Sequence, residues 1–349
     1  MPFPRTTMKD IALKMGVHAT TVSLALRNSP QLPVATRQRI QAAARKMGYH
    51  QDPLLSALVA YRTRDSVPKS QPEVAMIFDF KNPDELGQCP PSNRHFLAGA
   101  TRKAEELGYK IQPYFFEGRH RQSEGRRIGR IMDHRGVKGA ILCAFRPRTD
   151  RFDFDWDRFS VVQIECQHLA LPLHTVSADQ TMMAREAVRR LVWHGYRRLG
   201  IAIGRDEEIY LDHAFTVGFH GEMSLHPNLE PAPVLLLPNG VAPKEITATL
   251  RQWIRRHRVE AIISNWQSVQ AALALGRTEA TPDPIVVILG ATPNRGPFGG
   301  MSQRDAVVGE RAMEQLAMLL KTNQTGCLDA PNRILVPGEW IPGPCPVEA

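Results

Sequence analysis

The first 64 residues constrain this chain most, because a strongly basic composition coincides there with a pattern of three short helices. This segment holds three Lys and seven Arg against two Asp and no Glu, a net charge of +8. The whole chain carries +9, so the other 285 residues sum to about +1. A basic module joined to a nearly neutral body is typical of a protein that binds nucleic acid.

The order of capping and apolar residues predicts a helix-turn-helix. Thr7 and Asp10 have the spacing of a capping box at a helix start, and Gly16 ends that helix. A second helix is expected over about Ala19–Leu26, and Pro33 suits the first turn of a third. The third helix carries an inward apolar stripe of Ile40, Ala43, Ala44 and Met47. Two short helices joined by a glycine-containing turn and supported by a third form the helix-turn-helix unit.

The run Thr7–Ser23, TMKDIALKMGVHATTVS, closely resembles the headpieces of the lactose-repressor (LacI/GalR) family of bacterial transcription regulators. Those headpieces carry the pattern TxxDVAxxAGVSxxTVS, and the resemblance continues through Thr36-Arg37 and Gly48-Tyr49. It implies that residues 1–51 form a DNA-binding headpiece. The alternative is a small helical bundle without a role in DNA binding.

The resemblance also assigns the residues that contact DNA. The second helix is expected in the major groove, where its N-terminal residues reach base edges. The expected base contacts are His18, Ala19, Thr20, Thr21 and Leu24. The expected phosphate contacts, which position the protein without specifying sequence, are Thr7, Lys9, Ser23, Thr36 and Arg37. Family members often have polar residues at the positions of Ala19 and Leu24, so the operator is expected to differ from theirs.

Residues 52–73 are predicted to be a hinge helix and a linker. Asp52 and Pro53 suit a helix start, and the apolar segment that follows is too short to form a stable helix alone in water. The resemblance implies a hinge that folds on DNA, with Ala57 and Leu58 in the minor groove as an apolar wedge. The alternative is that these apolar residues pack as an ordinary core helix.

From residue 74 onward, short apolar runs alternate with helical stretches, a pattern that indicates parallel sheets. The expected strands are Val74–Phe80, Lys110–Phe116, Gly139–Phe145, Ser160–Glu165, Arg198–Ile203, Val234–Leu237, Ala261–Ser264, Ile285–Leu289 and Arg333–Val336. The expected helices are Phe96–Leu107, Ser123–His134, Gln180–His194, Ala214–Met223, Lys244–His257, Ser268–Leu275 and Ala306–Leu320. Two such units in tandem predict two Rossmann-like lobes.

The resemblance extends more loosely to this body and implies an α/β periplasmic-binding-protein-like core over residues 74–349. In that fold the chain crosses between lobes three times, and we place the crossings near residues 195, 303 and 330. The N-lobe then comprises about 74–195 and 304–329, and the C-lobe about 196–303 and 330–349. A small ligand is expected between the lobes, at the carboxyl ends of the strands.

Strand ends and positions that match the family give the candidate effector-binding residues. They are Phe80, Asn93, Phe145, Arg146, Asp179, Phe215, Asn265 and Trp266. Trp266 stands where the family has an aspartate, and Phe215 where sugar-binding members often have an arginine. These departures weaken the case for a free hexose, although aromatic faces can stack on a sugar ring. The alternatives are that the aromatic residues pack the lobe cores, or that the cleft binds nothing.

Several classes of function find no support in the residues. The chain has no GxSxG, HExxH, P-loop or GxGxxG motif, so we expect no catalysis and no cofactor. The five cysteines are scattered without a CxxC pair, and the histidines lack metal-ligand spacing, so we expect no metal site. No signal peptide and no apolar run of membrane length is visible, which predicts a cytoplasmic protein without membrane contact.

Together these expectations describe a homodimeric, sequence-specific transcriptional regulator, in the first instance a repressor. Its DNA partner is a near-palindromic double-stranded operator, and its effector is a small molecule, expected to be a carbohydrate or a derivative. Open alternatives are an effector-independent or activator-type regulator of the same fold, an enzyme or sugar-binding protein with a vestigial headpiece, and a nonspecific architectural DNA binder. The sequence names neither effector nor operator.

Overall fold

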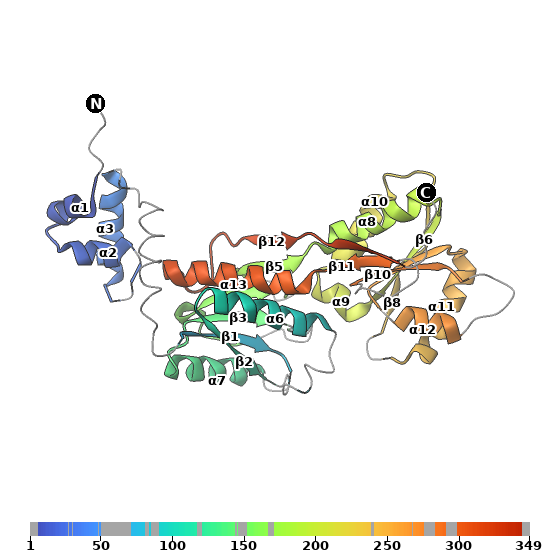
Figure 1. The fold of residues 1–349 in the computed structure, drawn as a ribbon, viewed down its shortest axis with the longest axis horizontal. Coiled ribbons are helices and arrows are strands. Elements are labelled where there is room, and N and C mark those ends of the chain that lie inside the picture. The colour runs from blue at the N-terminus through green and yellow to red at the C-terminus, as the bar shows by residue number, and fades with distance from the viewer. Residues whose placement is uncertain are drawn as a thin grey trace, which may run out of the picture.

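The computed structural model describes most of the headpiece and most of the body. The described residues are 6–26, 28–29, 31–47, 49, 71–80, 84, 91–116, 121–143, 145, 152–166, 171–238, 241–266, 268–275, 283–290 and 299–343. The predicted hinge residues Ala57 and Leu58 and the predicted effector residue Arg146 lie outside this set. In Figure 1 the headpiece lies at one end of an elongated molecule, followed by two sheet-containing units.

The headpiece contains three helices, α1 (Met8–Met15), α2 (Ala19–Leu26) and α3 (Val34–Lys46). The Thr7–Asp10 capping box opens α1, and Gly16 closes it with a left-handed φ of 64°. Ile11, Val22 and Ile40, one from each helix, are fully buried against one another. This small apolar core fixes the angle between α1 and α2, as the helix-turn-helix pattern predicts.

The first unit of the body is a six-stranded parallel sheet in the order β12-β5-β4-β3-β1-β2. Its strands are β1 (Glu73–Phe78), β2 (Lys110–Phe115), β3 (Gly139–Cys143), β4 (Ser160–Ile164), β5 (His174–Ala178) and β12 (Arg333–Val336). Helices α6 (Pro91–Glu106) and α13 (Asp305–Thr322) cover one face, and α7 (Arg121–His134) packs on the other. A short 3-10 turn, Trp156–Arg158, precedes β4.

The second unit is a mostly parallel sheet in the order β13-β11-β10-β9-β6-β7, with β8 also paired to β6. Its strands are β6 (Arg198–Gly204), β7 (Glu230–Pro231), β8 (Leu235–Leu237), β9 (Ala261–Ser264), β10 (Ile285–Leu289), β11 (Gly299–Ser302) and the antiparallel β13 (Glu339–Pro342). Helices α8 (Gln180–Trp193) and α10 (Ala214–Met223) pack on one face, and α11 (Pro243–His257) and α12 (Ser268–Leu275) on the other. Helix α9 (Arg205–Tyr210) follows β6 directly.

Two of the three expected crossings are misplaced. Helix α8 packs against α10 and strands β9 to β11, so the first crossing follows β5, near Asp179, and not residue 195. Strand β12 pairs with β5 in the first sheet, so the third crossing falls between Val336 and Glu339, and not near 330. An apolar helix face shows that a helix is packed, but it does not show which sheet the helix covers. The second crossing joins β11 to α13 around residues 303–304.

The sequence pattern also missed β5, β7, α9, β11 and β13. Strand β5 reads HTVSA, and it lacks the apolar run by which the other strands were recognised. No helix within the described part of the chain is both long and apolar enough to cross a lipid bilayer.

Candidate DNA-binding surface and effector site

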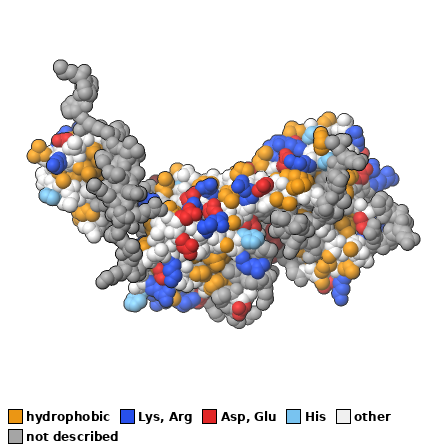
Figure 2. All heavy atoms as spheres, in the orientation of Figure 1, with side chains coloured by type: hydrophobic (Ala, Val, Ile, Leu, Met, Phe, Trp, Pro, Cys, Tyr) orange, Lys and Arg blue, Asp and Glu red, His pale blue; other side chains and the backbone are white. Residues whose placement is uncertain are grey.

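The N-terminal end of α2 presents a small polar surface. His18 and Thr20 are exposed, and the His18 Nδ1 atom lies in contact with the Thr20 hydroxyl. Thr21 and Leu24 are half-buried, and Ala19 packs partly against the headpiece core. Of the five predicted base contacts, His18 and Thr20 are therefore the most accessible. On the face of the body that Figure 2 shows, acidic and basic side chains are intermixed, which agrees with the low net charge of the body.

Helix α3 holds the far end of α2 in place. The Gln41 amide donates to the Ala25 carbonyl at 2.8 Å. The Arg37 guanidinium donates to the backbone oxygen of Asn28 at 2.8 Å and to its side-chain Oδ1 at 3.1 Å. Arg37, which was predicted to bind phosphate, thus makes two hydrogen bonds to the turn after α2 in this structure. This contact gives Arg37 a role in orienting α2.

The other predicted phosphate contacts differ in their surroundings. Lys9 is exposed on α1, whereas Ser23 and Thr36 are half-buried. The Thr7 hydroxyl donates to the Asp10 carboxylate at 2.7 Å, and this hydrogen bond lowers the pKa of Asp10. Lys9 is the predicted anchor most open to a phosphate group.

The headpiece touches the body through the turn after α2. The side-chain amide of Asn28 donates to the carbonyl of Asn323 at 3.2 Å. Asn323 follows α13 and has a left-handed φ of 49°. The Arg37 contact and this hydrogen bond therefore share Asn28, so the turn after α2 is linked to the C-terminal end of α13.

A buried carboxyl group lies where the two sheets meet. Glu165 follows β4, has a left-handed φ of 61°, and accepts a hydrogen bond from the Gln180 amide of α8 at 2.8 Å. Burial raises the pKa of Glu165 to about 8, and the nearby charge of Asp305 adds to this effect. Since β4 belongs to the first sheet and α8 packs on the second, the Glu165–Gln180 bond joins the two units.

Tyr210 makes a second link across the same junction. Its hydroxyl, at the end of α9, donates to the Ile164 carbonyl at 3.3 Å and lies 3.9 Å from the Cys166 sulfur. Burial raises the pKa of the Cys166 thiol to about 12 and the pKa of Tyr210 well above its ordinary value. Both groups are therefore neutral near pH 7, and they serve as hydrogen-bonding partners.

Asp305 brings another carboxyl group to this junction from the start of α13. Its Oδ2 lies 3.6 Å from the His95 Nδ1 atom of α6, and its Oδ1 has no hydrogen-bond partner among the described residues. Burial raises the pKa of Asp305, while His95 and Ser92 oppose that shift. Glu165, Tyr210 and Asp305 were missed by the sequence reasoning. The available signal was that Glu165 ends an expected strand and that Asp305 lies between an expected crossing and the expected helix Ala306–Leu320.

The predicted polar effector residues lie at strand ends or in the first turn of a helix: Asp179 follows β5, Asn265 follows β9, and Asn93 lies at the start of α6. The Asn93 Oδ1 atom lies 3.9 Å from the Cys143 sulfur at the end of β3. Asp179 caps α8 by accepting from the Met182 amide at 3.0 Å. In the second unit, the Asn265 Oδ1 accepts from the Gly204 amide at 3.0 Å, which joins the ends of β9 and β6.

The predicted aromatic residues are largely core residues in this conformation. Phe80, Phe145 and Phe215 are 4%, 0% and 1% exposed. Phe145 packs edge-on against Phe152, with ring centroids 5.0 Å apart. Trp266 is half-buried against the cluster under α11 and α12. The packing interpretation therefore accounts for the three phenylalanines here, and Trp266 is the predicted aromatic residue that keeps an exposed surface.

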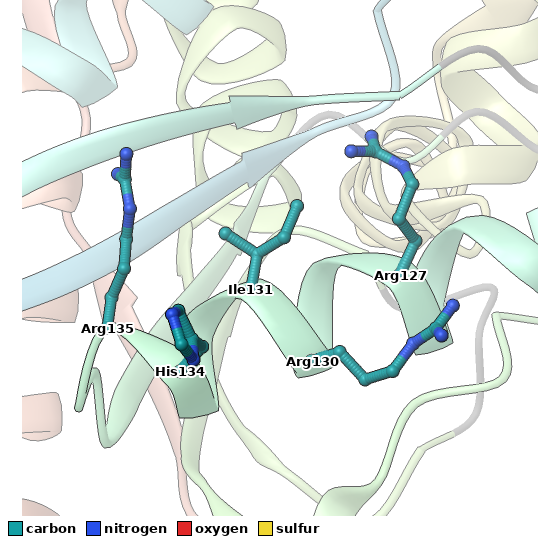
Figure 3. A pocket seen from close by; sticks show the side chains of 5 residues that line it. All are labelled: Arg127, Arg130, Ile131, His134 and Arg135. Atoms are coloured by element: carbon teal, nitrogen blue, oxygen red, sulfur yellow. The ribbon is translucent and has the colours of Figure 1, made fainter.

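Two hollows among the described residues lie away from this junction. The first, about 300 Å³, lies on the outer face of α7 and is lined by Arg127, Arg130, Ile131, His134 and Arg135. Figure 3 shows Arg127 and Arg135 extending to the same side of α7, with Ile131 between them. The second, about 190 Å³, lies beside β4, β5 and β12. Among described residues, no group of three or more His, Cys, Asp or Glu is placed to hold a metal ion.

Known proteins resemble the chain both in sequence and in fold. Residues 7–52 match the profile "Bacterial regulatory proteins, lacI family". The HTH-type transcriptional repressor CytR of Escherichia coli (strain K12) is 27% identical over 203 residues, 58% of this chain and 54% of that protein. The chain thus matches about half the length of such curated relatives.

Solved structures share the fold over nearly the whole chain. A transcriptional regulator CelR in complex with cellobiose aligns with a TM-score of 0.60 at 18% identity, covering 97% of this chain and 98% of that one. The Lac repressor dimer bound to operator and the anti-inducer ONPF aligns with a TM-score of 0.57 at 14% identity, with the same coverage. The two-unit α/β body and helical headpiece are therefore the architecture of these regulators. Residues 7–52 thus match the lacI family of bacterial regulatory proteins, and the chain as a whole shares the fold of these solved regulators.

Proposed function

We propose that this protein is a sequence-specific DNA-binding transcriptional regulator that acts as a homodimer on a near-palindromic operator. The observation that carries the proposal is the exposed His18–Thr20 pair at the start of α2, on a helix held by the Gln41 and Arg37 contacts from α3. A helix that is rigidly placed and polar at its N-terminal end suits the major groove. Two-fold symmetry of the protein then requires two matching half-sites.

Thr20→Ala is expected to relax base preference at one position of each half-site, by about five- to tenfold, because the hydroxyl that bonds a base edge is lost. Operators are first selected from random duplexes with the natural protein, and affinities for single-base variants are then compared. Lys9→Gln should instead weaken all duplexes alike and reduce the salt slope by about 0.9. The exposed Gln38→Ala is the matched control on α3 and should change neither property. Unaltered base preference in Thr20→Ala would show that α2 is not the reading helix.

For the effector we propose a small carbohydrate or carbohydrate derivative, bound where the two sheets meet. Asn93, Glu165 and Asp305 of the first unit lie at strand and helix ends there. Asn265 lies at the end of β9 in the second unit. The regulator CelR, of the same fold, is known in complex with cellobiose, which supports this class of ligand. Binding there would change the relation of the two units and, through α13 and Asn28, the position of the headpiece. We propose repression as the sign of regulation and a cytoplasmic location.

A thermal-shift screen of mono- and oligosaccharides and sugar acids against the full chain tests the effector. A ligand at 100 times its dissociation constant should stabilise the protein by about 2.7 kcal/mol. Glu165→Gln should reduce the shift, whereas Arg130→Gln on α7 should leave it unchanged. A blank across the screen would favour the alternative of an effector-independent regulator, with DNA binding still tested by the Thr20 experiment.

A further inference from the structure

The smaller hollow lies near the β12 edge of the first sheet, on a face where the buried strands β4 and β5 carry polar side chains. Gln163 on β4, Thr175 on β5 and Arg333 on β12 are register partners, so their side chains form one row on the same face. Strands buried in parallel sheets usually carry continuous aliphatic residues. Here three adjacent strands place an amide, a hydroxyl and a guanidinium side by side.

The hydrogen bonds of this row leave one buried acceptor unused. The Thr175 hydroxyl donates to the Leu173 carbonyl at 3.3 Å, so it can only accept from Gln163, whose Nε2 lies 2.7 Å away. This fixes the orientation of the amide and leaves Gln163 Oε1 without a partner among the described residues. Gln163 is only 3% exposed. A buried carbonyl oxygen of this kind requires a donor.

A charged donor lies at the other end of the row. Arg333 is exposed, and no carboxylate of the described residues pairs with it. Between these groups is the hollow of about 190 Å³, closed on its sides by Leu171, Leu173 and Pro331. Since a water molecule takes roughly 30 Å³ in the liquid, the space suits one organic molecule of about six to ten heavy atoms.

We propose that this hollow is a second ligand site, which takes a small carboxylate bearing a hydroxyl or amino donor. The carboxylate pairs with Arg333, and the hydroxyl or amino group donates to Gln163 Oε1. A guanidinium binds a carboxylate through two parallel hydrogen bonds, and the apolar walls accommodate the carbon chain.

The site is separate from the effector site at the sheet junction. Thr175 precedes Asp179 by four residues, a rise of about 13 Å along the strand. The hollow therefore lies at the amino ends of β5 and β12 and beside the carboxyl half of β4, where Gln163 precedes Glu165 by two residues, whereas the effector is expected beyond the carboxyl ends of the strands. Its wall continues into the segment that runs back to Asn323, which accepts the headpiece hydrogen bond from Asn28. Leu328 and Asn332 of that segment bond to Pro172 and His174 beside the hollow.

Ligand-observed NMR titration of the full chain tests the site with three related probes. Lactate offers both a carboxylate and a hydroxyl, propionate only the carboxylate, and propane-1,2-diol only hydroxyl groups. Lactate is expected to bind at least about tenfold more tightly than either partial probe, because each lost charge-assisted or buried hydrogen bond weakens binding by about that factor. Glycerate, which also has both groups, should behave as lactate does.

Substitutions of the lining residues test whether lactate binds in this hollow. Arg333→Gln, at an exposed position that should not disturb folding, is expected to weaken lactate binding by about tenfold or more. Gln163→Leu should act similarly, and thermal unfolding checks that it still folds. Arg130→Gln, an exposed arginine on α7, is the matched control and should bind as the natural protein does. Absence of lactate and glycerate binding at tens of millimolar, or binding that survives Arg333→Gln, would overturn the proposal and leave ordered water as the occupant.

Discussion

Gly309→Ala is expected to lower the free energy of unfolding by about 3 kcal/mol, because α6 and α13 touch through their backbones. A Cβ atom at Gly309 would overlap the Phe96 carbonyl oxygen and lie 2.9 Å from the Ala100 amide. Gly99 on α6 makes the reciprocal approach to the Ala306 carbonyl. Neither backbone can move aside without separating the two helices. The measurement is thermal or urea unfolding of the full chain.

Gly221→Ala is the matched control for this prediction. Gly221 also lies inside a helix, α10, but a Cβ atom there would meet nothing within 4 Å. The same substitution should therefore stabilise the protein by about 0.5–1 kcal/mol, since alanine loses less conformational entropy on folding. If both variants had the same stability, the close approach of α6 and α13 would be wrong.

The stability of the body is expected to fall as pH rises from about 5 to 8 and then level off, with Glu165 as the main cause. The pKa of Glu165 is about 8 in the folded protein and near 4.5 when the chain is unfolded. Between these values the folded state binds more protons than the unfolded state, so rising pH favours unfolding. Each pKa unit corresponds to about 1.4 kcal/mol, which gives a total on the order of a few kcal/mol.

Urea unfolding of the natural protein and of Glu165→Gln across this pH range measures the effect. The glutamine keeps an acceptor for Gln180 but cannot ionise, so its profile should be much flatter. Asp305 also has a raised pKa and contributes in the same direction, and Asp305→Asn should therefore move the Glu165 midpoint to lower pH. Identical slopes for the natural protein and Glu165→Gln would show that Glu165 is ionised throughout.

The headpiece could be derived from the sequence because its signals are local. The capping pair Thr7 and Asp10, the left-handed Gly16 and the apolar positions Ile11, Val22 and Ile40 all act within a few helical turns. Local signals also indicated which end of α2 is polar. They did not show that Arg37 would be used to clamp Asn28, because that contact depends on how α3 packs across the turn.

For the body, the sequence predicted the positions of most helices and strands, but it predicted less well which sheet each of them joins. Most strands and helices fall where the alternation of apolar runs placed them. The assignments of α8 and β12 to a lobe were wrong, because an apolar face is satisfied equally well by either sheet. The phenylalanines proposed for the effector site show the same ambiguity: Phe145 and Phe215 are apolar at strand or helix ends, and only packing distinguishes a core residue from a binding residue.

By itself the sequence determined the class of fold, the helix-turn-helix and the division into a basic headpiece and a nearly neutral body. These properties follow from the spacing of capping and apolar residues and from the distribution of charged residues, both of which can be read from the sequence directly. Only the tertiary structure decided that Glu165 meets Gln180, that Gly309 meets Phe96, and that Gln163, Thr175 and Arg333 form one row. Each of these contacts joins residues from different helices or strands, and their meeting depends on strand order and helix packing that no local pattern specifies.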